Sequence, residues 1–97
     1  MKAECMWVVE EVETTSGDIQ DTSCWPTALA AREYARRAVA DGIKLNVALV
    51  RTDYEGDREW AYLRDDGTLP ASFVDAYGYE TCPVPRRFLA EARKAAA

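Results

Sequence analysis

The residue types that most often carry catalysis are sparse in this chain, which holds three cysteines and no histidine. Cys24 stands where a helix is expected to begin, and a helix N-terminus lowers the pKa of a thiol. A thiol nucleophile of this kind needs a histidine base, which the chain lacks. We therefore interpret Cys24 as a small buried residue and predict that the protein is not an enzyme.

Metal and phosphate sites require residue spacings that the sequence does not contain. Cys5, Cys24 and Cys82 are not paired in the manner of a zinc site, and no histidine completes one. The segment 65–68 contains the Asp-Gly pair that turns favour, so we interpret it as a turn. No glycine-rich phosphate loop is present. We expect neither a metal nor a cofactor, and an enzyme that relies on carboxylates or tyrosines is the least favoured alternative.

Acidic residues form the most distinctive pattern in the chain. Four of them alternate along one segment: Asp53, Glu55, Asp57 and Glu59. Alternate residues of an extended segment lie about 6.8 Å apart on one side. Carboxylates in such a row imitate a phosphate backbone and can occupy the basic nucleic-acid channel of a partner protein. Gly56 is expected to bend the row into a cluster. The plainer alternative is a hairpin tip that is acidic because water solvates it.

The net charge of −5 is unevenly distributed along the chain. Residues 1–22 carry −5 and residues 53–80 carry −6, whereas residues 23–52 and 81–97 each carry +3. Three further candidate partner-binding acids lie on the first expected strand: Glu10, Glu11 and Glu13. The overall charge disfavours direct nucleic-acid binding. The alternative is that the arginines of the two expected helices form one basic face that binds nucleic acid.

The segment Lys44–Arg64 predicts a β-hairpin around which the rest of the chain is expected to be organised. Lys44–Thr52 alternates between two sets of side chains, and Arg58–Arg64 is rich in residues that favour strands. Between them, Asp53–Asp57 has the length of a hairpin loop, with Gly56 free to take a positive φ. An isolated hairpin is marginally stable, so other elements must cover it.

A register that places Thr52 opposite Arg58 separates two faces of this hairpin. One face is aliphatic: Leu45, Val47, Leu49, Ala61 and Leu63. The other face carries Trp60 and Tyr62, and we place Trp7 of the first strand there too. Aromatic residues of the C-terminal segment either cover this second face or leave it exposed, as at a protein-binding hot spot.

The remaining elements complete an α+β fold with a small, mainly antiparallel sheet and helices packed on one face. The strand and helix order is β-α-β-β, followed by a coil or short helix and a C-terminal helix. The expected elements are a strand at Cys5–Glu13, a mobile polar loop at Thr14–Ser23, an alanine-rich helix from Cys24 or Thr27 to Asp41, a short helix at Ala71–Tyr77, an edge strand at Tyr79–Val84 and a helix at Arg86–Lys94.

Length and composition favour one globular domain that spans residues 1–97. No apolar run approaches the roughly 20 residues of a membrane span, and the N-terminal segment does not have the pattern of a signal peptide. Three unpaired cysteines suit a reducing compartment. We therefore expect a cytoplasmic protein of a bacterial host cell, monomeric or homodimeric.

The chain resembles the small anti-CRISPR proteins that phages encode, specifically type I inhibitors. The residues concerned are Met1-Lys2-Ala3, the acid-containing strand around Val8–Val12, the polar insertion after it and the alanine-rich helix. The resemblance implies a non-enzymatic protein that binds a Cas surveillance complex or its nuclease and blocks nucleic-acid recognition. The alternative is a generic interaction module or regulatory subunit, which would use Trp60, Tyr62 and the helix arginines.

Overall fold

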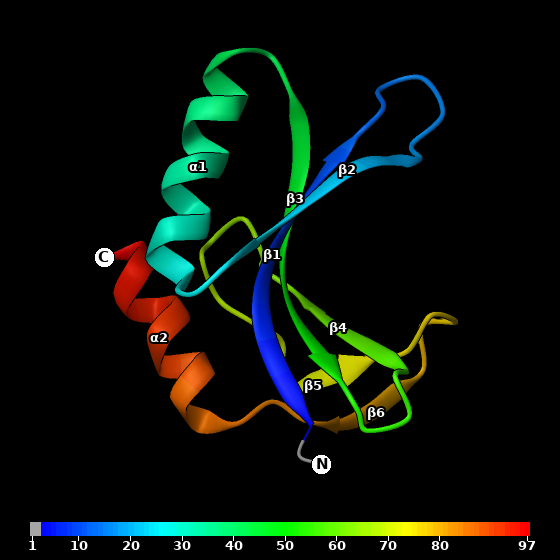
Figure 1. The fold of residues 1–97 in the computed structure, drawn as a ribbon. Helices are drawn as coiled ribbons and strands as arrows, with labels where there is room; N and C mark the ends of the chain where they lie inside the picture. The colour runs from blue at the N-terminus through cyan, green and yellow to red at the C-terminus, as the bar shows by residue number, and fades with distance from the viewer. Residues whose placement is uncertain (1–2) are drawn as a thin grey trace.

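The computed structural model describes residues 3–97, which form one six-stranded antiparallel sheet and two helices (Figure 1). The strand order across the sheet is β2-β1-β3-β4-β5-β6, and both helices lie on one face. The α+β class and the C-terminal helix are confirmed. In chain order the elements are β1 (Glu4–Val12), β2 (Ile19–Trp25), α1 (Ala28–Ala40), β3 (Lys44–Thr52), β4 (Arg58–Tyr62), β5 (Ser72–Val74), β6 (Glu80–Pro83) and α2 (Arg86–Ala96).

The central hairpin of β3 and β4 has the register expected from the sequence. Val50 lies opposite Trp60, and Ala48 lies opposite Tyr62. Strand β1 pairs with the other edge of β3 along all nine of its residues. The three strands β1, β3 and β4 therefore form the middle of the sheet, and alternation along them assigns every side chain to one of two faces.

Strand β2 corrects the prediction of a mobile loop at Thr14–Ser23. Residues 19–25 form a strand that pairs with β1, with a register shift between Glu11 and Val12, and the turn before this strand is closed by a 2.9 Å hydrogen bond from Gly17 N to Glu13 O. The sequence concealed this strand because β2 is an edge strand. It is held through its backbone, and its mostly exposed side chains show no apolar alternation.

The short helix predicted at Ala71–Tyr77 is also wrong. Ser72–Val74 form strand β5, whose Val74 pairs with Trp60 of β4, and residues 75–79 form the loop to β6. Three residues are too few to show a strand pattern. Helix α1 begins at Ala28, with the Thr27 hydroxyl accepting a 3.1 Å hydrogen bond from Ala30 N. Cys24 therefore lies on β2 and not at a helix N-terminus.

The hydrophobic core lies between the sheet and the two helices. Four alanines of α1 are buried, so the helix packs closely on the sheet. Trp7 is the largest core residue, with 1% of its surface exposed, and its ring meets the edge of Phe88 at a centroid distance of 6.5 Å. Our placement of Trp7 beside Trp60 was wrong, because Trp7 lies opposite Leu49 and so faces the helices.

The two helices also contact each other at the start of α1. The Glu91 carboxylate of α2 accepts a 2.6 Å hydrogen bond from the backbone N–H of Ala28. An acid at this position satisfies a free N–H and interacts favourably with the helix dipole. No helix within residues 3–97 is long and apolar enough to cross a membrane.

We predict that Gly67→Ala destabilises the fold more than Gly78→Ala, which serves as its matched control. Both glycines have φ +85°, so either alanine strains the backbone by about 1 kcal/mol. A Cβ on Gly67 would lie 2.5 Å from the Cβ of Ala96, whereas a Cβ on Gly78 would meet no atom within 4 Å among residues 3–97 other than those of its chain neighbours. At Gly67, overpacking against Ala96 should lower the free energy of unfolding by a further 1–3 kcal/mol, roughly. Equal free energies of unfolding in urea would contradict this contact between the loop and α2.

Candidate functional site

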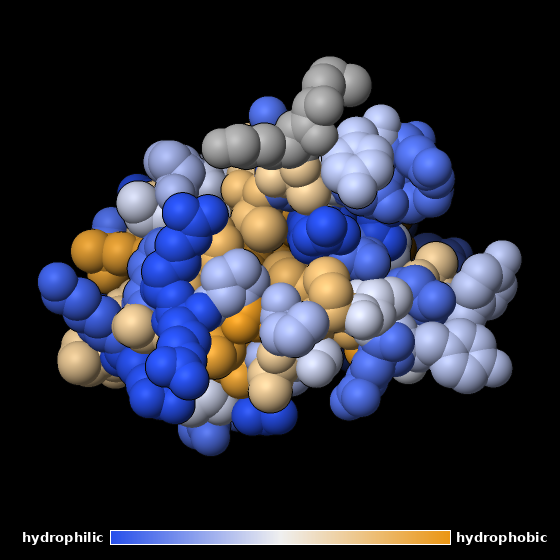
Figure 2. Space-filling model, turned by 90° about the horizontal axis from the view of Figure 1, so that it is seen from below, coloured by the Kyte–Doolittle hydropathy of each residue, from blue (hydrophilic) through white to orange (hydrophobic). Residues whose placement is uncertain are grey.

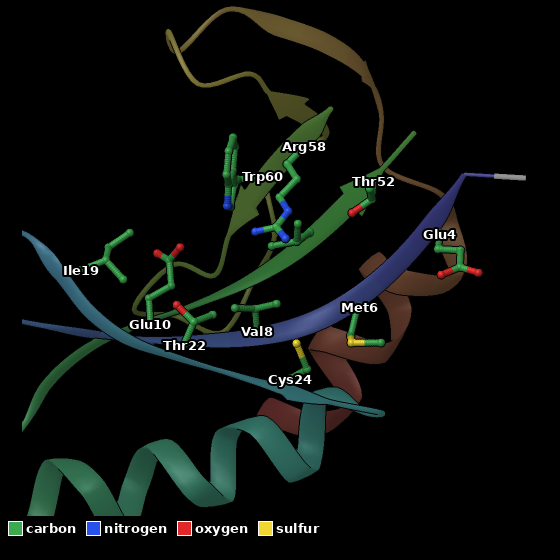
Figure 3. Close-up of a pocket in the computed structure, with 11 residues that line it drawn as sticks. Glu4, Met6, Val8, Glu10, Ile19, Thr22, Cys24, Thr52, Arg58 and Trp60 are labelled. Atoms are coloured by element: carbon green, nitrogen blue, oxygen red, sulfur yellow. The ribbon is translucent and has the colours of Figure 1, made fainter. Parts of the chain in front are cut away.

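The sheet face opposite the helices carries a concave groove (Figure 3). Its floor is a small apolar cluster of Val8, Ala48 and Val50, with Trp60 packed against it. The volume of the hollow is about 500 Å³, in the range of ligand and peptide sites. We call it the open-face groove, and it is lined by Glu4, Met6, Val8, Glu10, Ile19, Thr22, Cys24, Val50, Thr52, Arg58 and Trp60.

Large apolar side chains surround this groove and are in contact with solvent. Met6, Ile19 and Tyr62 are all exposed, and Trp60 is half-buried. They come from β1, β2 and β4, so the pairing of these strands with one another and with β3 brings them together. The C-terminal residues expected to cover the face do not do so: Phe73 and Phe88 belong to the helix-side core, and Tyr77 is exposed.

Glu10 is the charged residue most deeply placed in the groove. Only 4% of its surface is exposed, and its Oε1 atom has no hydrogen-bond partner among residues 3–97. Burial raises the pKa of the Glu10 carboxyl, and the hydroxyl of Tyr62 acts in the opposite direction. Burial and the negative charge of Glu10 together raise the pKa of Tyr62 to about 12. The groove therefore holds a buried carboxylate with a free acceptor atom.

Cys24 lines the same groove and is exposed, which corrects our prediction of a buried residue. Its position follows from the edge strand β2, which the sequence did not reveal. The other two thiols are less exposed, and burial is the main cause that raises the pKa of Cys5 and of Cys82. Cys82 also donates to the Glu59 carboxylate at 3.5 Å.

The four alternating acids of the hairpin do not lie in one row. Asp53 is occupied by its own loop, where its Oδ1 accepts backbone hydrogen bonds from Glu55 and Asp57, each at 2.9 Å. Glu59 lies on the helix side and forms a 2.7 Å ion pair with Arg51. Glu55 and Asp57 remain exposed at the tip.

The three candidate acids of β1 are separated as well. Glu10 lies in the groove, whereas Glu11 accepts a 2.7 Å hydrogen bond from the Tyr34 hydroxyl of α1 on the other face. Glu13 closes the turn after β1 through hydrogen bonds from Thr15 and Ser16, which lower the pKa of its carboxyl to about 2. Strand alternation explains the separation of Glu10 from Glu11.

A second loop lies at the same end of the sheet as the hairpin tip. Strand β5 runs antiparallel to β4, so loop 75–79 lies at the end where loop 53–57 lies. Figure 2, which views the molecule from below, shows apolar side chains reaching the surface across the middle of this view. We call these two loops, together with Glu80, the acidic loop end. Its loop residues include Asp53, Tyr54, Glu55, Asp57, Asp75, Tyr77 and Tyr79.

The loop 75–79 was missed as part of a site, although the sequence holds a signal for it. Asp75 accepts backbone hydrogen bonds from Tyr77 at 2.9 Å and Tyr79 at 3.0 Å, as Asp53 does in the first loop. Each loop contains the pattern Asp-x-x-Gly, with the glycine at positive φ. Tyr54, Tyr77 and Tyr79 are exposed on these loops. The repeated pattern predicts two similar loops, and the topology places them together.

The described residues 3–97 contain no group of three or more acidic or cysteine side chains placed to hold a metal ion. Comparison of the chain with protein-family models, with curated proteins and with solved structures found no match.

We predict that Glu10→Gln raises the free energy of unfolding at neutral pH and leaves it unchanged in acid. The folded pKa of Glu10 lies above its ordinary value of 4.5, so the folded state binds the proton more tightly. The wild-type protein should therefore lose stability, relative to the variant, as the pH rises from about 4.5 through the folded pKa. Urea unfolding over a pH series measures this difference.

The substitution Glu13→Gln should have the opposite pH dependence and is the control for Glu10→Gln. The folded pKa of Glu13 is about 2, below its ordinary value of 4.5. Its stabilising effect is present above about pH 4.5 and is lost as the pH falls towards 2. Parallel curves for the two variants would contradict the different environments of these acids.

Native alkylation should modify Cys24 before Cys5 and Cys82. Cys24 is exposed, whereas the two other thiols are partly buried and have raised pKa values. Iodoacetamide labelling followed by peptide mass spectrometry measures the three rates. Faster labelling of Cys5 or Cys82 would contradict the position of β2.

Proposed function

We propose that this chain is a non-enzymatic protein-binding module whose open-face groove holds a partner protein. The observation that supports the proposal is the one-sided cover of the sheet, which leaves the groove and its apolar side chains in contact with solvent. Exposed apolar surface beside a concave site is typical of binding surfaces. Tyrosine and tryptophan are frequent at the centre of such interfaces. Trp60 lines the groove, and Tyr62 lies on the same strand and is exposed.

A second candidate is an inhibitor of nucleic-acid recognition that acts through the acidic loop end. The separation of charge favours it: the two helices carry seven basic and two acidic residues, a net charge of +5, so the other residues carry −10. Exposed acids and tyrosines of two loops share one end of the sheet. Such a surface suits the basic nucleic-acid channel of a partner. The resemblance to anti-CRISPR proteins makes a Cas surveillance complex the partner to test.

The groove is tested with a matched pair of substitutions, Ile19→Glu and Leu29→Glu. The two side chains are 54% and 52% exposed, but Ile19 lines the groove and Leu29 lies on α1. We predict that a tagged bait with Ile19→Glu binds its partner at least about tenfold more weakly, because the new charge must be desolvated. Leu29→Glu should bind as the wild type does.

The measurement begins with capture from a nuclease-treated bacterial lysate, followed by titration of the recovered partner with each purified variant. Protection of Cys24 from iodoacetamide by the partner reports directly on the groove. Equal affinity of the two variants, or unchanged labelling of Cys24 in the complex, would exclude the groove as the binding surface.

The second candidate is tested by reversing two charges at the hairpin tip. Wild-type protein should prevent a purified type I surveillance complex from binding DNA, and Glu55→Lys combined with Asp57→Lys should restore DNA binding. The control combines Glu33→Lys with Asp65→Lys, two exposed acids away from this end. The effect should weaken with salt, since exposed charges are screened. Inhibition that survives the tip reversal would contradict this role.

A further inference from the structure

We propose that the open-face groove receives a lysine or arginine side chain of the partner protein, with Glu10 as its acceptor. This inference rests on the proposed function and states what the groove recognises. Only 4% of the surface of Glu10 is exposed, and its Oε1 accepts no hydrogen bond within residues 3–97. Buried carboxylate oxygens are normally paired with donors. A cationic side chain supplies both the donor and the opposite charge.

The surroundings of Glu10 suit the long side chain that carries such a cation. Figure 3 shows Glu10 and Trp60 extending into the same space, from β1 and β4. Trp60 brings an aromatic ring, a group that attracts cations, to this groove, and the apolar floor at Val8 and Val50 suits the methylene groups of lysine or arginine. The hydroxyl of Tyr62 hydrogen-bonds the carboxyl group of Glu10 but brings no positive charge.

The groove's own cation does not satisfy this carboxylate. Arg58 lines the groove from β4, yet within residues 3–97 no ion pair of 4.0 Å or less joins it to Glu10. The register partners of Glu10 on the neighbouring strands are Thr22 and Asn46, both uncharged. Glu10 is thus held in the apolar sheet face without a compensating charge. That arrangement costs stability, and a partner's cation would offset the cost.

The inference is tested with two short extended peptides, Ac-Val-Thr-Lys-Val-Thr-amide and the same peptide with norleucine in place of lysine. Each is titrated into the ¹⁵N-labelled full chain, and chemical shifts report binding. The lysine peptide should shift the Trp60 indole N–H and the Glu10 amide, and the norleucine peptide should bind at least about tenfold more weakly. In Glu10→Gln, affinity for the lysine peptide should fall to that of the norleucine peptide.

Other results would overturn the inference. The inference is wrong if the wild-type chain binds both peptides with equal affinity, a result that can be obtained without any variant. It is also wrong if neither peptide produces saturable chemical-shift changes. Binding of n-pentylamine as tight as that of the lysine peptide would assign the groove to a small amine instead. Self-association that Glu10→Gln abolishes would assign the cation to a second copy of this chain.

Failure of the inference is distinguishable from failure of the proposed function. If Ile19→Glu weakens partner binding but the lysine and norleucine peptides bind with equal affinity, the groove binds a partner without recognising a cationic side chain. If Ile19→Glu leaves the affinity for the partner unchanged and Cys24 stays reactive in the complex, the groove is not the interface and both proposals fail.

Discussion

The pairing of β1 with β3 is the constraint on which the rest of this structure depends. Nine consecutive residues of β1 pair with β3, and this register assigns every side chain of β1 to a face. A shift by one residue would exchange the faces. Trp7 would then leave the core that it shares with Phe88, and Glu10 would move from the groove to the helix side. One set of backbone hydrogen bonds thus fixes both the core and the candidate site.

The helices complete one layer and leave the other face of the sheet available. Both pack on the side of Trp7 and Leu49, where small alanines of α1 allow close approach. The hydrogen bond from Ala28 N to Glu91 joins the start of α1 to α2. Because both helices lie on this side, the smaller apolar cluster around Val50 on the other face is open to the groove.

The acids of the chain serve different purposes once the chain is folded. Glu59 and Glu11 are held by Arg51 and Tyr34, while Asp53 and Glu13 organise loops and are largely unavailable to a partner. Glu10 is buried in the groove, and its Oε1 has no hydrogen-bond partner within residues 3–97. The net charge therefore overstates the number of acids that are exposed and unoccupied, among which are Glu55 and Asp57 at the hairpin tip.

The sequence by itself determined the local elements: the β3–β4 hairpin with its register, the alanine-rich helix and the C-terminal helix. These follow from alternation, turn residues and capping within short stretches, where each residue is close to its partner in the chain. The identification of Trp60 and Tyr62 as residues of a second sheet face also followed from that register. Tertiary structure alone decided the role of β2, the face of Trp7 and the burial of Glu10. The edge strand β2 leaves no periodic signal because its side chains are mostly exposed, and the side of the sheet that each face of β1 occupies depends on hydrogen bonds to β3, far away in the sequence.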